Sequence, residues 1–108
     1  MIHVRIIRNE HKHIASFEVS GHAESGPYGH DLVCAAVSAV TFGTVNAIMK
    51  LLCIEPTIQQ GGEGGYLKMD LPTITIPEVL EKAQTLLEGM VVSLETIERD
   101  YHQYITIS

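Results

Sequence analysis

The sequence has 108 residues and a mass of 11.9 kDa, the size of one compact domain with its own hydrophobic core. Apolar residues make up 45 % and charged residues 19 %, which excludes an intrinsically disordered chain. The formal net charge of −6 excludes general electrostatic attraction to nucleic acid and suits a basic protein partner. We therefore expect a single domain over residues 1–108 that makes no direct contact with nucleic acid.

The first residues lack the basic and then apolar order of a signal peptide, and we expect no apolar run near the ~20 residues of a membrane span. These features predict a cytoplasmic protein without a membrane contact. The two cysteines have neither CxxC nor zinc-ligand spacing, so free thiols are expected and no metal site.

The first half of the chain predicts a hairpin, a loop and a helix. Alternating apolar and polar residues predict strands over 2–8 and 13–20, joined by a turn over 9–12. The glycine-rich segment 21–30 predicts a flexible loop. Asp31 suits the N-cap position, and the apolar spacing after it predicts a helix from about Leu32 to Leu52.

The second half predicts another hairpin, a helix and a closing strand. Short strands are expected over 57–60 and 66–71, and the glycines of 61–65 between them suit a hairpin tip or a flap that faces substrate. Thr75 and Glu78 have capping-box spacing, and helical periodicity continues to about Asp100. Residues 101–107 alternate as a final strand.

The resulting order, ββαββαβ, predicts an α+β fold in which two helices pack on one face of an antiparallel or mixed sheet. One small layer leaves apolar surface uncovered, which favours a homodimer. The alternative is a monomer with an ordinary exposed sheet face.

Cys34 is the candidate nucleophile. If Asp31 caps the helix, Cys34 is its third residue, where free backbone N–H groups and the positive end of the helix dipole favour a thiolate. The same N–H groups are candidates for an oxyanion hole. His22, at the end of the second predicted strand, can serve as general base or as the cation of an ion pair. The alternatives are a small buried Cys34 in an Ala/Val helix and a His22 that faces water.

Two nearby residues are candidates for supporting roles. Ser38 lies one helical turn after Cys34, where its hydroxyl can bond the sulfur, the imidazole or substrate, or simply its own backbone. Asp31 can orient His22 as well as cap the helix. Cys53 is too far along the helix to form a disulfide with Cys34 and is expected to be a buried structural thiol.

The remaining motifs point to little chemistry. His30, beside Asp31, competes with His22 for the role of base. His11 and His13 could join a metal site only if other ligands converged on them, which we do not expect. The glycines of 61–65 lack the Lys-Ser/Thr of a phosphate-binding loop. No cofactor is predicted.

The sequence resembles the ribosomal-processing cysteine protease family (Prp, YsxB-like), in a motif of Gly21-His22-Ala23, Gly29, Asp31 and Val33-Cys34-Ala35-Ala36-Val37-Ser38. The resemblance extends over the whole chain in length and element order. It implies a homodimeric cysteine endopeptidase that removes an N-terminal extension from a large-subunit ribosomal protein, the twenty-seventh in the series, by cutting after an aromatic residue.

Carried over by position, the resemblance makes Cys34 the nucleophile and His22 its partner, with Asp31 and Ser38 supporting the site. The segment from Gly26 through Gly29 to His30 matches a mobile loop over the site. The rival hypothesis is a non-enzymatic acidic module that binds a basic ribosomal protein during ribosome assembly. A redox-sensing thiol ranks third, because no resolving cysteine lies nearby.

Overall fold

A computed structural model describes residues 1–21, 27–61 and 65–108, with residues 27–31 described by their backbone. The elements are β1 (Ile2–Arg8), β2 (Ile14–Ser20), α1 (Pro27–Leu52), β3 (Thr57–Gln60), β4 (Tyr66–Asp70), α2 (Pro77–Tyr101) and β5 (Ile105–Ile107). This order confirms the predicted ββαββαβ arrangement and the α+β class.

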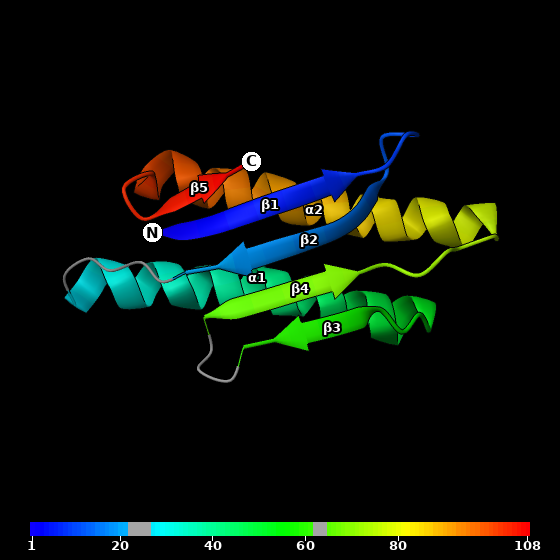
Figure 1. The fold of residues 1–108 in the computed structure, drawn as a ribbon, viewed down its shortest axis with the longest axis horizontal. Helices are drawn as coiled ribbons and strands as arrows, with labels where there is room; N and C mark the ends of the chain where they lie inside the picture. Colours follow the sequence, from blue (N-terminus) through cyan, green and yellow to red (C-terminus); the bar gives the residue numbers. More distant parts are fainter. Residues whose placement is uncertain (22–26, 62–64) are drawn as a thin grey trace.

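The strands form one five-stranded mixed sheet in the order β3-β4-β2-β1-β5. β1 pairs antiparallel with β2 and parallel with β5, and the other two pairings are antiparallel. Both helices lie on the same face of this sheet and pack against each other (Figure 1). The predicted two-layer arrangement is therefore confirmed.

α1 begins earlier than the sequence predicted. Its first residue is Pro27. Proline suits the first helical turn because its φ is already helical, and because an N–H group at this position would have no acceptor within the helix. Residues 27–31, expected to be loop and cap, are helical, so the prediction of Asp31 as N-cap is wrong. Gly29 and His30 likewise belong to the helix and not to a flexible loop.

The start of α2 also differs from its prediction. Ile76 is the N-cap, and no side chain caps the helix, so the capping box expected at Thr75 does not form. The backbone oxygen of Ile76 instead accepts bonds from the amides of Val79 and Leu80 at 3.1 and 3.0 Å. α2 runs to Tyr101, so the last strand is shorter than the predicted 101–107.

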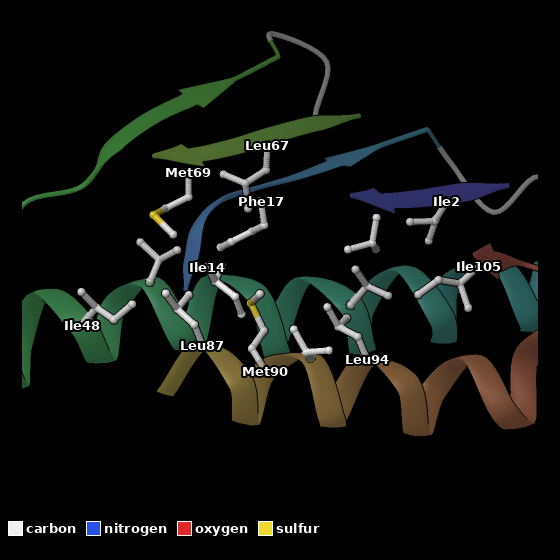
Figure 2. Packing of buried hydrophobic residues seen from close by; sticks show 14 of the residues in the cluster. Ile2, Ile14, Phe17, Ile48, Leu67, Met69, Leu87, Met90, Leu94 and Ile105 are labelled. Carbon is white, nitrogen blue, oxygen red and sulfur yellow. The ribbon is translucent and has the colours of Figure 1, made fainter. Parts of the chain in front are cut away.

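The core lies between the sheet and the two helices. Figure 2 shows Phe17 of β2 and Met69 of β4 directed toward the helices, where Ile48 of α1 and Leu87 of α2 meet them. Each of these four side chains is fully buried. Burying a side chain of this size contributes about 1.5–3 kcal/mol, so this cluster fixes how α1 lies on the sheet.

α1 is more apolar than the sequence analysis predicted. Leu32–Leu52 is 21 residues long with a mean hydropathy of 1.9, so by length and composition alone it could cross a membrane, contrary to our expectation. In the fold this stretch is a core helix, with Val33, Val37 and Ile48 buried against the sheet and α2. Only 28 % of its most apolar 18-residue stretch is buried, so much of the apolar surface of α1 faces outward.

Candidate active site

A pocket of about 400 Å³ opens between the first half of α1 and the end of the sheet where β2 finishes. Its α1 wall holds Cys34, Ser38 and Phe42, which stand one turn apart on the same side of the helix. The facing wall is formed by Gln60 and Gly61, at the end of β3. We call this hollow the Cys34 pocket.

Cys34 is partly buried and packs against the hydrophobic core while still lining the pocket. It is therefore neither the fully buried core residue of the alternative reading nor a freely exposed surface thiol. Ser38 lines the same pocket and is exposed, so its hydroxyl can reach a bound molecule. The sequence placed both residues together correctly.

The helix N-terminus does not act on Cys34 as predicted. Because α1 begins at Pro27, Cys34 is its eighth residue, about two turns inside the helix. The helix dipole acts mainly within the first turn, and amides this far inside bond to carbonyls of the preceding turn. The predicted oxyanion hole at the amide of Cys34 is therefore wrong, because that amide is already used by the helix.

Gly21 directly follows β2, at the edge of the pocket, in a conformation that needs glycine. Its φ is +87°, and a Cβ there would lie 2.4 Å from the carbonyl oxygen of Met1. Its amide donates to the carbonyl of Gly65 over 3.0 Å, which joins the end of β2 to the β3–β4 hairpin. The chain continues from Gly21 directly into His22, which lies outside the described residues.

Tyr66 lines the pocket at the start of β4 and is tied to a neighbouring strand. Its hydroxyl donates to Glu18 Oε2 over 2.6 Å, and Arg5 Nη1 lies 3.4 Å from the other carboxylate oxygen. The bond from Tyr66 lowers the pKa of Glu18, and the same bond raises the pKa of Tyr66. Tyr66 is therefore a neutral donor, held in place by β2.

The described part of the pocket holds no base. Among its described lining residues, only Cys34 and Tyr66 can titrate. His11 and His13 lie at the β1–β2 turn with ring centroids 6.4 Å apart, and they line other hollows. Within the described residues no group of three His, Cys, Asp or Glu side chains could hold a metal ion.

The other predicted site residues lie where side chains are not described. His22 and Gly26 are outside the described residues, and Gly29, His30 and Asp31 are placed by their backbone in the first turns of α1. Sequence reasoning missed Phe42, although its spacing of eight residues from Cys34 could have revealed it. Gly61 and Gly65, suggested as part of a flap, do line the pocket.

Cys53 differs from its prediction. It is exposed and follows α1 with a φ of 55°, whereas the sequence predicted a buried thiol. The left-handed turn directs the chain so that the next residue, Ile54, is buried instead.

The fold and the pocket define a small α+β protein with an accessible thiol whose described pocket neighbours are neutral, an arrangement suited to nucleophilic thiol chemistry. Residues 1–106 match the family described as cysteine protease Prp. The chain belongs to this family and is a cysteine protease.

Named relatives match the chain over its full length. A ribosomal processing cysteine protease Prp from Bacillus subtilis (strain 168) is 49 % identical over 108 residues, covering all of this chain and 96 % of the relative. A crystal structure of the ribosomal processing protease Prp from S. aureus, in complex with a covalently linked product peptide, is 39 % identical with a TM-score of 0.88. It covers all of this chain and 98 % of that chain. A second S. aureus structure, with a substrate peptide, has 38 % identity, a TM-score of 0.85 and the same coverage.

Proposed function

We propose that this chain is a cytoplasmic cysteine endopeptidase that acts in ribosome maturation. Its substrate is the twenty-seventh protein of the large ribosomal subunit, from which it removes an N-terminal extension. The observation that carries this proposal is the position of Cys34 in a pocket of a chain that matches Prp proteases from end to end. The covalently linked product peptide of the S. aureus protein supports the same chemistry.

In the proposed mechanism, the thiolate of Cys34 attacks the carbonyl carbon of the scissile peptide bond, and its sulfur forms a bond to that carbon. The carbon–nitrogen bond breaks as protonated His22 gives its proton to the leaving amine. His22 then takes a proton from water, which attacks the thioester and releases the carboxylate product and Cys34. A single catalytic domain, residues 1–108, performs both the acylation of Cys34 and the hydrolysis of the thioester without a cofactor.

His22 is favoured as the base by chain connectivity. It follows Gly21, so its Cα is about 3.8 Å from the Cα of a residue that lines the pocket. His30 competes for this role, because the backbone of α1 places it one helical turn before Cys34. Asp31 orients the base in this proposal, because the helix begins before it and Asp31 is not its cap. Gly26, Gly29 and His30 belong to the segment that is proposed to contact the substrate.

Two neutral donors of the described pocket suit the oxyanion that forms during attack. Ser38 offers its hydroxyl from the same side of α1 as Cys34, and Gln60 offers its side-chain amide from β3. A donor aimed at developing negative charge contributes about 2.7–4 kcal/mol in comparable sites. These two side chains replace the amide of Cys34, which the sequence analysis had predicted as a donor of the oxyanion hole.

The proposal predicts that the intact mass of an N-terminally extended substrate falls by one N-terminal fragment with the wild-type protein. Cys34→Ala should abolish cleavage, and His22→Ala should slow it by about 10²- to 10⁴-fold, the usual contribution of a general base. His102→Ala is the control, because this exposed residue follows α2 and does not line the pocket. A loss of this size at His30→Ala, with little loss at His22→Ala, would instead assign the base to His30.

Thiol labelling gives an independent measure of reactivity. Cys53 is exposed and would itself be labelled, so the pH dependence of iodoacetamide reaction is measured in a Cys53→Ala background. Fast reaction at neutral pH in the folded protein is expected. An unchanged substrate mass together with slow labelling would instead favour the acidic module that only binds a basic ribosomal protein.

We further propose that two copies associate through the outward face of α1. The polar residues Asn46 and Lys50 lie toward the C-terminal end of this face, and its exposed apolar side chains include Leu32, 55 % exposed, and Met49, 43 % exposed. Between them lie the small exposed residues Ala35, Ala39 and Gly43, which permit two helices to approach closely. A second copy supplies the matching apolar helix by symmetry, because a two-fold interface uses the same surface twice.

A further inference from the structure

The two edges of the sheet differ in what covers them. β5 forms one edge, where the outward amide of Ile107 donates to Glu98 Oε2 over 2.9 Å. β3 forms the other edge, and all four of its residues are exposed. No side chain of the described residues makes a hydrogen bond to the backbone of β3. One edge is therefore occupied and the other is open.

The register of β3 shows which backbone groups are open. Gly61 donates its amide to the carbonyl of Tyr66 over 3.1 Å, so these two residues form a hydrogen-bonded pair. Hydrogen-bonded and non-bonded pairs alternate along an antiparallel ladder. Gln59 is thus bonded to Lys68, whereas the amides and carbonyls of Ile58 and Gln60 point away from β4.

This open edge leads into the Cys34 pocket. Gln60, the last residue of β3, lines the pocket together with Cys34. Ile58 pairs with Met69 and Gln60 with Leu67, so both lie on the sheet face that α1 covers. Across the pocket, Ser38 and Phe42 continue the row that begins at Cys34. A chain lying between this row and β3 would therefore pass the thiol.

We infer that the peptide substrate binds as an additional strand along β3. Its backbone pairs with the amides and carbonyls of Ile58 and Gln60, and alternate side chains point toward α1. Main-chain bonds of this kind hold a peptide extended and supply affinity, while pockets select its side chains. The inference rests on the proposed function, because it places the residues that flank the scissile bond of the same substrate.

Amide hydrogen exchange measured by NMR tests the pairing directly. The sample is the Cys34→Ala protein with an uncleaved peptide that spans the end of the extension and the first residues of the mature ribosomal protein. At about 90 % saturation, exchange at the amides of Ile58 and Gln60 should slow about tenfold, because only the free fraction exchanges. Gln59, already bonded to β4, serves as the internal control and should not change.

Proline substitution tests the same bonds through kinetics. Ile58→Pro removes an amide that faces the open edge, so pairing with β4 is preserved. Ile58→Ala is the matched control, because it also removes the side chain but keeps the amide. Loss of one hydrogen bond should raise KM of the proline variant about 2- to 12-fold over the alanine variant, with kcat unchanged.

Three outcomes would overturn the inference. One is equal KM for Ile58→Pro and Ile58→Ala. Another is unchanged exchange at Ile58 and Gln60 when peptide is bound. The last is slow exchange at these amides without peptide that depends on protein concentration, which would assign the edge to a second copy. If the wild-type protein cleaves the peptide in any of these cases, the proposed function stands and only the inference fails.

Discussion

Cys53 and Gly21 both hold left-handed backbone conformations at the end of an element, with φ of 55° and 87°. Gly21 has no Cβ and adopts this conformation without strain. Cys53 has a Cβ, and a left-handed conformation costs an L-residue about 1–2 kcal/mol. The turn after α1 is therefore the more strained of the two.

Replacing Cys53 by glycine should stabilise the protein. Glycine removes the strain of the left-handed turn but loses more backbone entropy on folding, so the expected net gain is about 0.5–1 kcal/mol. For a domain of this size the melting temperature should rise by roughly 2–6 °C. Cys53→Ala is the control, because it keeps the Cβ, and calorimetry that gave both variants the same melting temperature would contradict the prediction.

Single residues show where sequence reasoning works and where it stops. Cys34 and Ser38 were predicted to lie on the same side of the helix, and both line the pocket. This prediction does not depend on where the helix begins, because residues four positions apart share a helical face. Gln84 was not predicted to be buried, because a polar residue on an apolar helix stripe has no local signal for its partner. Its side chain bonds both the amide and the carbonyl of Ile14, 70 residues away, at 2.7 and 3.0 Å.

At the scale of elements, the types and order of helices and strands were predictable and their ends were less so. Apolar periodicity runs through the middle of each helix, which is why α1 and α2 were found. Their first turns depend on competing choices of cap, and at both helices a proline and not the nearby acidic or hydroxyl side chain marks the start. The early start of α1 in turn changed the expected electrostatics of Cys34.

β1 and α2 are joined at the surface by a two-pronged ion pair, and this pair predicts a pH dependence. Arg8 Nη2 lies 3.0 Å from one oxygen of Glu88, and Arg8 Nη1 bonds the other. The guanidinium of Arg8 lowers the pKa of Glu88 below its usual value of 4.5. The folded state therefore favours the ionised carboxylate, and its contribution to stability is complete above the unfolded pKa and is lost as pH falls through the folded pKa.

Urea unfolding between pH 6 and pH 3 checks this dependence. Wild type should lose more stability than Glu88→Gln as the pH falls below about 4.5, by at most about 1 kcal/mol, because both side chains are partly exposed. Glu81→Gln is the control, since Glu81 forms no ion pair with a described residue. Parallel curves for wild type and Glu88→Gln would exclude a contribution from the pair.

On the scale of the whole molecule, α1 belongs to the core on one side, and its other side has no packing partner among the residues that the structure describes. The sequence predicted that one small layer leaves apolar surface uncovered, on the helices as well as on the strands. The outer sheet face is instead polar, with Arg5, Glu18 and Lys68 side by side on neighbouring strands. The apolar surface that supports a homodimer lies on α1, because burial of a long helix on a small sheet covers only one of its sides.

Two exposed helical glycines provide a matched test of the dimer. A Cβ at Gly43 of α1 or at Gly89 of α2 meets no atom within 4 Å, so glutamate fits at either position in the protomer. Gly43→Glu places a charge on the proposed interface and should give a monomer in sedimentation analysis. Gly89→Glu should remain dimeric, like wild type. A monomeric wild type, or equal behaviour of the two variants, would contradict the proposed interface.

The parallel pairing of β1 with β5 has a consequence for how the molecule is made. Ile2 pairs with Ile105, and the amide of Ser108 donates to Val4 over 2.8 Å, so the first strand is completed by a segment synthesised roughly a hundred residues later. Contacts of such long sequence separation form slowly, because the chain loses loop-closure entropy before it gains the favourable energy of the contacts. Ile2 also lines the pocket of Cys34. The part of the pocket wall that Ile2 forms is therefore expected to be completed late in folding, after the hairpins and helices built from local contacts.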